Sequence, residues 1–161
     1  MDMTPEKYIA RLTEILQKKL LILQDILMLT EAQTGTINED GIEDLRKLID
    51  EKQVKIDSVN KLDEEFAVYF QRLKSSLKIT RLDELDASGI KGAGRLKEAT
   101  AEILCMIGRI SEVEKQNNIK SKELLDRLGG EVKKINLGKR ANSAYAHGPI
   151  NIPSYFIDKK K

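Results

Sequence analysis

The chain has 161 residues, of which 40% are hydrophobic, 34% are charged and only 4% are aromatic, and it contains no Trp. This length favours one domain, and the composition is typical of a helical protein with narrow apolar seams rather than a globule with a wide core. Residues 139–161 hold five basic residues and one acidic residue, whereas residues 1–138 hold 23 and 25. Residues 1–138 are therefore nearly neutral, which argues against a nucleic-acid duplex as the main partner, because such a partner needs a clustered basic face.

No targeting signal or membrane anchor is expected. The longest uncharged apolar stretches, Leu20–Leu23 and Ile26–Leu29, are far too short to cross a bilayer. Cys105 is the single cysteine, so no disulfide can form within the chain. Both features fit a cytoplasmic protein.

The first predicted helix covers residues 5–33. Thr4, Pro5 and Glu6 give it an N-cap hydroxyl, a proline at the first helical position and an acidic first turn. Apolar residues at helical spacing then form a broad face, and Gly35 predicts the end of the helix.

The second predicted helix covers residues 39–80. Ile37 and Ile42 have the spacing of a hydrophobic staple, and Asp40 and Glu43 have that of a capping box. An apolar stripe follows at alternating three- and four-residue spacing, broken only by Lys52 and by Asp63, and this pattern predicts left-handed helix-on-helix packing. The stripe consists of Ile42, Leu45, Ile49, Ile56, Val59, Phe66, Phe70, Leu73 and Leu77.

A glycine-rich connection, residues 86–94, precedes a third predicted helix over residues 93–137. Its stripe runs from Leu96 to Val113 and then changes register after Asn117, and Gly129-Gly130 should weaken or kink the last part. The residues expected after the change of register are Leu125, Leu128, Val132 and Ile135. The predicted fold is therefore all-α: residues 1–138 form an elongated up-down bundle of three helices, an antiparallel coiled coil.

Residues 139–161 are expected to form a flexible, basic, aromatic tail, because Pro149 and Pro153 forbid a continuous helix. Tyr145, Tyr155 and Phe156 are flanked by Gly and Pro, so no helix face explains them. They either fold back on the bundle or anchor a partner.

The sequence predicts no catalytic residue, no metal site and no cofactor. Cys105 and His147 cannot form a metal site with each other, and Cys105 is expected to be a small core residue. The segment from Gly89 to Leu96 has Arg95 and Leu96 where a phosphate-binding loop needs Lys and Ser or Thr. A protein without enzymatic activity is therefore expected.

Two segments resemble the FlgN-type flagellar export chaperones. Gly41 to Gln53, continuing through residues 60–66, resembles the second helix of that family. The tail is similar as well, with Tyr145 two residues before His147-Gly148, followed by Phe-Ile-Asp-Lys-Lys at residues 156–160.

The resemblance implies a cytoplasmic chaperone of flagellar type III protein export. Such chaperones bind the C-terminal helical segments of hook-associated proteins, prevent their premature assembly and deliver them to the export gate, so their association with the membrane is only indirect. It further implies that Tyr145, which matches a tail tyrosine of the family, contributes to docking at the gate. No cofactor and no nucleic acid are implied, and a homodimer is allowed.

The first helix is the most apolar, and its face around Ile15, Ile22, Leu23 and Ile26 is wider than one neighbouring helix needs. These four residues form the predicted client-binding groove. The alternative is a structural coiled-coil homo-oligomer or adaptor with no export role, and a third class is a nucleic-acid accessory protein that uses the lysine-rich end.

Overall fold

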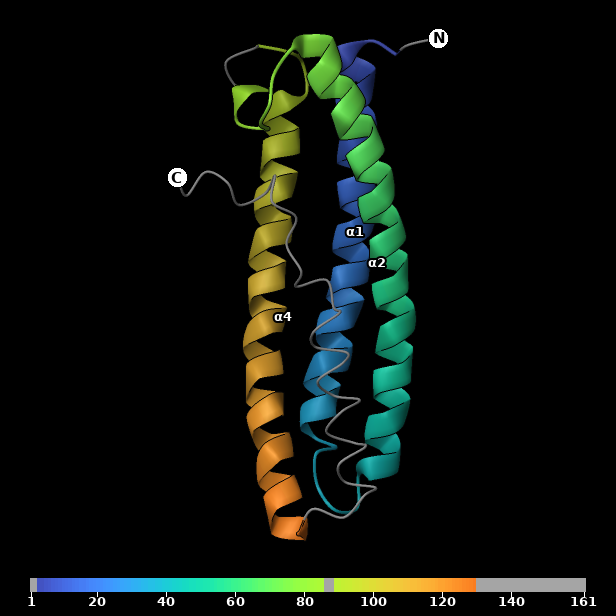
Figure 1. Ribbon diagram of the computed structural model, residues 1–161, viewed down its shortest axis with the longest axis vertical. Coiled ribbons are helices and arrows are strands. Elements are labelled where there is room, and N and C mark those ends of the chain that lie inside the picture. The colour runs from blue at the N-terminus through green and yellow to red at the C-terminus, as the bar shows by residue number, and fades with distance from the viewer. Residues whose placement is uncertain (1–2, 86–88, 130–161) are drawn as a thin grey trace.

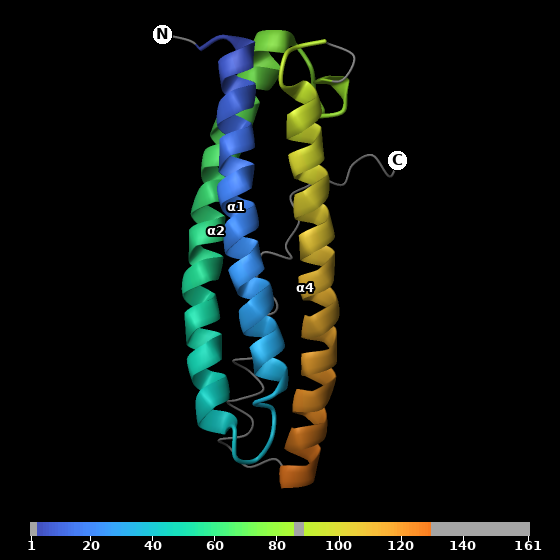
Figure 2. The same ribbon diagram turned by 180° about the vertical axis from the view of Figure 1, so that it is seen from behind.

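The computed structural model describes residues 3–85 and 89–129. Three long helices make up most of this part: α1 (Pro5–Thr34), α2 (Ile42–Leu77) and α4 (Ala93–Leu128). They lie side by side along one long axis, with α2 running opposite to α1 and α4 (Figures 1 and 2). The described residues contain no β-strand, which confirms the predicted all-α bundle. None of their helices is long and apolar enough to cross a membrane.

Helix α1 is the central element of the bundle. It packs against both α2 and α4, whereas the backbones of α2 and α4 come close to each other at few positions. A helix with two neighbours needs two apolar faces, and α1 accordingly buries adjacent residues in pairs, such as Ile15-Leu16 and Ile26-Leu27. The broad apolar face seen in the sequence is therefore used by two partner helices.

The termini of α1 follow the prediction closely. The Thr4 side chain accepts a hydrogen bond from the backbone N–H of Lys7 at 3.3 Å, and Pro5 occupies the first turn. Gly35 caps the other end, where its N–H donates to the Ala32 carbonyl oxygen at 3.2 Å.

The start of α2 differs from the prediction. The N-cap is Gly41, with no side-chain cap, so the capping box predicted from Asp40 and Glu43 is wrong. The Asn38 side chain instead accepts from the Asp40 N–H at 3.0 Å and holds the turn outside the helix. A Cβ at Gly41 would lie 2.4 Å from the Thr36 carbonyl oxygen, so the close return of the chain requires glycine here.

The ends of the other two helices come earlier than expected. Helix α2 ends at Leu77, and Lys78 follows in the left-handed conformation with φ 58°. Helix α4 ends at Leu128 and is capped by Gly129 with φ 83°, so this position stops the helix that the sequence extended to residue 137. The predicted seam residues Val132 and Ile135, and the whole predicted tail 139–161, lie outside the described residues.

The predicted stripe on α2 is largely confirmed. Phe66 and Phe70 are buried, with their ring centroids 5.9 Å apart, and they belong to the main core with residues of α1 and α4. Ile42 and Leu77, at the two ends of the stripe, are half-buried. Helix α2 thus uses one narrow seam, as its three-four spacing predicted.

The change of register predicted in α4 is wrong. Its seam continues in the original register beyond Ile110, and the buried positions are polar: Glu114, Asn117 and Ser121, followed by Leu124. An apolar pattern could not reveal this continuation, because polar residues occupy the seam where the helix packs. They divide the hydrophobic core into a large cluster and a small one, and the small one contains Ile37, Leu45, Ile49 and Leu124.

Candidate functional site

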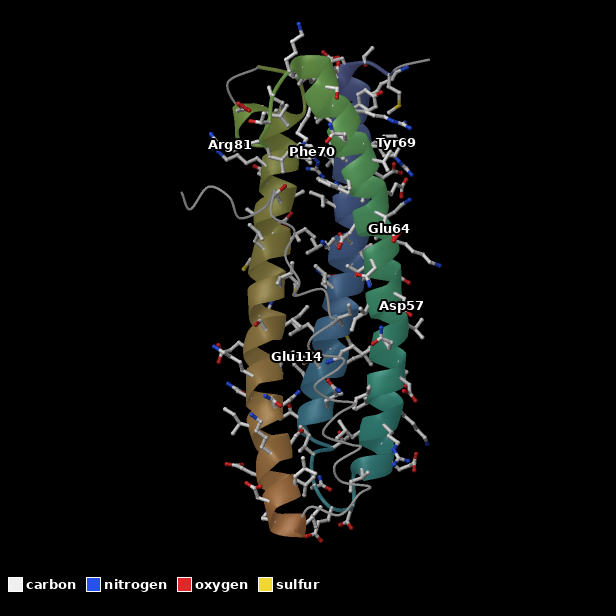
Figure 3. All side chains as sticks on the ribbon, viewed as in Figure 1. Asp57, Glu64, Tyr69, Phe70, Arg81 and Glu114 are labelled. Atoms are coloured by element: carbon white, nitrogen blue, oxygen red, sulfur yellow. The ribbon has the colours of Figure 1, made fainter. Side chains whose placement is uncertain are left out.

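The first break in the α2 stripe, Lys52, is the centre of a buried polar layer. Its ammonium group forms an ion pair with Glu114 of α4, and the two side chains are 3% and 8% exposed. Lys52 Nζ also donates to Gln33 Oε1 of α1 at 2.7 Å. Figure 3 shows Glu114 on the side of α4 that faces the other helices, whereas Asp57 and Glu64 lie on the outer side of α2. The layer therefore links all three helices.

Asn117 completes the layer next to this ion pair. Its amide nitrogen donates to the Thr30 carbonyl oxygen at 2.9 Å, and its amide oxygen accepts from the Thr34 hydroxyl at 2.6 Å. Among the described residues, no buried side-chain nitrogen or oxygen is left without a hydrogen-bond partner. A fully satisfied polar layer fixes the register of packed helices, because any slip would bury unpaired groups.

Burial lowers the pKa of Lys52 from its ordinary value, and Glu114 opposes this effect only in part. A lysine with a lowered pKa can act as a base or nucleophile when a substrate reaches it. The cavity beside Lys52 has a volume of about 20 Å³, which accommodates about one water molecule and no organic substrate. The arrangement supports a structural role for this lysine.

The second break in the stripe, Asp63, also marks an ion pair between helices, and this pair is partly buried. Lys19 Nζ of α1 lies 2.7 Å from Asp63 Oδ1, and the Lys19 side chain is 1% exposed. The sequence showed both breaks but not their partners, Glu114 and Lys19. The signal that could have found them is a charge of opposite sign at a seam position of a neighbouring helix.

No metal centre is present in residues 3–85 and 89–129: they contain no cluster of three or more His, Cys, Asp or Glu side chains suited to one. Cys105 is exposed, so the prediction that it packs in the core is wrong. It lies between the seam positions Ile103 and Ile107 and faces outward from α4. His147 lies outside the part of the chain described.

The structure separates the four residues of the predicted client-binding groove. Ile15, Leu23 and Ile26 are at most 1% exposed and belong to the main core, because α1 covers its apolar faces with α2 on one side and α4 on the other. Ile22 is half-buried and packs against the edge of that core. Of these four predicted residues, only Ile22 offers apolar surface in the three-helix arrangement.

Ile22 lines an open groove between α1 and α2, which we call the α1/α2 groove. Its volume is about 420 Å³, and most of its lining surface is apolar. Leu21, Ile22 and Leu62 supply the apolar part, and the other lining residues are Lys18, Ser58, Lys61 and Glu65. Leu21 is 64% exposed, so apolar surface remains in contact with solvent at this site.

An ion pair between α1 and α2 lies near each end of this groove. Arg11 pairs with Glu65 near one end, and Lys55 Nζ lies 3.2 Å from Asp25 Oδ2 near the other. The guanidinium of Arg11 also lies 5.6 Å from the ring centroid of Tyr69. These contacts hold the two helices together while leaving the apolar floor between them open.

The fold and this site define a class of protein: a helical binding scaffold with an open apolar groove that suits a partner helix better than a small molecule. The FlgN protein family model matches residues 1–148. The chain therefore belongs to the FlgN family of flagellar export chaperones, as the resemblance in its second helix and tail implied. Comparison with curated proteins and with solved structures gave no match.

Proposed function

We propose that this protein binds the C-terminal helical segments of flagellar hook-associated proteins in the cytoplasm, prevents their premature assembly and delivers them to the export gate. FlgN-family chaperones bind hook-associated proteins, which supports the class of client. The observation that carries the proposal is the open α1/α2 groove, where Leu21, Ile22 and Leu62 leave apolar surface exposed.

We propose that the client binds α1 through Ile22 and not through all four residues of the predicted groove. Ile22 contacts the client, whereas Ile15, Leu23 and Ile26 form the packed layer beneath that holds α1 in place. A preformed groove on a rigid pair of helices costs little ordering free energy in the chaperone, so the cost of folding falls on the client segment.

Delivery is proposed to use Tyr145 as the contact with the export gate. This residue lies outside the described residues, and its support is the family resemblance of the tail together with its place between Ala144 and Ala146, ahead of Gly148-Pro149. Such a contact would associate the chaperone with the membrane only through the gate.

The experiment that tests the proposal is calorimetric titration of the full chain with C-terminal segments of the hook-associated proteins from its own organism. Saturable binding of at least one segment, and co-purification of the same protein from cells, is the expected result. Absence of binding by every segment would reject the function. A stable dimer with no exposed apolar groove would instead favour the structural homo-oligomer.

A further inference from the structure

Exposed apolar residues extend the α1/α2 groove along the molecule. Of the five large hydrophobic side chains that are exposed in the described part of the chain, four lie on α1 and α2: Leu21, Met28, Val54 and Val68. Leu21 and Met28 are two turns apart on one side of α1, and Val54 and Val68 are four turns apart on one side of α2. The groove-lining residues Ser58, Lys61 and Glu65 lie between the two valines on the same side of α2.

The carboxylates and the lysines of the groove differ in whether they form ion pairs. Its carboxylates already have partners, because Glu65 pairs with Arg11 and the adjacent Asp25 pairs with Lys55. Lys18 and Lys61 also line the groove, and neither has an ion-pair partner among residues 3–85 and 89–129. Two lysines without an ion-pair partner in the described residues therefore flank an apolar floor.

We propose that the α1/α2 groove binds one amphipathic helix whose apolar ridge is flanked by carboxylates. The ridge packs on Leu21, Ile22 and Leu62, and Asp or Glu residues beside it meet Lys18 and Lys61. This inference rests on the proposed function and identifies the chemistry of the client segment. The distance from Val54 to Val68 along α2 is about 21 Å, so about four turns of the client helix fit this face.

A second copy of this chain is a poorer occupant. A symmetric dimer through this face would bring Lys18 and Lys61 of one copy toward the same lysines of the other, and the carboxylates of the face are already engaged with Arg11 and Lys55. Like charges placed together in an interface disfavour it. The partner therefore has to bring free carboxylates of its own.

The first test uses the full-length chain and two designed helical peptides that share one leucine ridge. One peptide carries Glu on both sides of the ridge, and the other carries Lys at the same positions. The Glu peptide should shift the methyl NMR signals of Leu21, Ile22 and Leu62 and should bind at least about tenfold more tightly than the Lys peptide, with an advantage that falls as salt rises. Equal affinities, or shifts confined to other residues, would overturn the proposal.

The second test reverses the charges of the groove. The double variant Lys18→Glu/Lys61→Glu should prefer the Lys peptide over the Glu peptide. The matched control is Lys115→Glu/Lys122→Glu, which makes the same change of net charge at two exposed lysines of α4 and should keep the preference of the wild type. An equal loss of preference in both double variants would show an effect of net charge alone and would reject the groove.

Competition between the Glu peptide and a hook-associated segment tests whether the client occupies the α1/α2 groove. A hook-associated segment that binds the chain should displace the Glu peptide and should bind Lys18→Glu/Lys61→Glu at least about tenfold more weakly. A segment that binds without displacing the peptide, and whose affinity is the same for the wild type and for Lys18→Glu/Lys61→Glu, would overturn this inference. The proposed function would then still stand. If the Glu peptide binds in the groove and no hook-associated segment binds the chain, the proposed function fails and the groove chemistry stands.

Discussion

The Lys52 ammonium group on α2 and the Glu114 carboxylate on α4 form an ion pair inside the bundle, between two helices whose backbones come close at few positions. Gln33 of α1 accepts a second hydrogen bond from the same lysine at 2.7 Å. A single residue of α2 is thus tied to both other helices. The contribution of this layer to the unfolding free energy can be measured directly.

Removing one member of the pair should destabilise the protein strongly. Glu114→Leu leaves a buried ammonium group without its counter-charge, and the expected loss is about 3–5 kcal/mol of unfolding free energy, measured by urea denaturation. The double variant Lys52→Met/Glu114→Leu should regain part of that loss, because it removes the unpaired charge, although Gln33 Oε1 then loses the ammonium group that donates to it. Lys55→Met, which breaks a more exposed pair with Asp25, is the control and should cost less than about 1 kcal/mol.

The contribution of Lys52 to stability should depend on pH. Burial lowers the pKa of Lys52 in the folded protein below the ordinary value of 10.5, so the unfolded chain holds this proton more tightly. Between the lowered pKa and pH 10.5 the unfolded state binds more protons, and stability therefore rises with pH in that window. Relative to Lys52→Met/Glu114→Leu, the wild type should gain unfolding free energy as the pH approaches 10.5; a constant difference would contradict the burial effect.

The buried aromatic pair of Phe66 and Phe70 should carry a large part of the stability. Phe66 is 1% exposed, and Phe66→Ala should cost about 3–5 kcal/mol through lost transfer free energy and the cavity left behind. Val68, two residues later on the same helix, is 49% exposed, and Val68→Ala should change stability by less than about 0.5 kcal/mol. Similar losses at both positions in thermal or urea unfolding would mean that α2 packs with a different face.

Substitutions at two leucines of α1 should affect different properties, one the folding of the bundle and the other client binding. Leu23 is 0% exposed, so Leu23→Asp buries an unpaired carboxylate and should unfold the bundle, which circular dichroism would show. Leu21 is 64% exposed and lines the α1/α2 groove, so Leu21→Asp should keep its helicity and lose at least about tenfold in affinity for a hook-associated segment. A folded Leu21→Asp variant with unchanged affinity would place the client elsewhere.

Tyr145→Ala should affect delivery and leave client binding intact. An aromatic ring contributes contact area at modest entropic cost, which suits a weak docking contact. The variant should retain helicity, thermal stability and client affinity, and it should lose affinity for the cytoplasmic part of the export gate in a pull-down assay and reduce motility in cells. Loss of client affinity with gate binding intact would falsify this division of roles.

The sequence predicted the fold well because its signals were local. The cap at Thr4 and the heptad stripe of α2 each depend on neighbours within a few residues, and both appear in the structure. The sequence predicts α4 to residue 137 with a weak point at Gly129-Gly130, whereas the helix ends at Leu128 and Gly129 is its cap. Propensity alone does not distinguish a kink from a stop.

The candidate site was harder to predict because it depends on which helices become neighbours. The apolar face of α1 suggested an open groove, yet α1 uses most of that face for α2 and α4. Ile22 was the one predicted residue at the solvent edge, and Leu21 and Leu62 were missed because neither belongs to a seam. The continuation of the α4 seam through Glu114 and Asn117 was missed because its side chains are polar.

The polar layer also divides the bundle along its length. On one side of it lies the small cluster of Ile37, Leu45, Ile49 and Leu124, next to the turn at residues 35–41, and on the other side lies the main core. Few apolar contacts cross a layer of ion pairs and amides, so the two parts do not have to open together. We therefore expect the turns of α1, α2 and α4 beside the small cluster to exchange their amide hydrogens through partial opening, while the part that contains the main core remains folded.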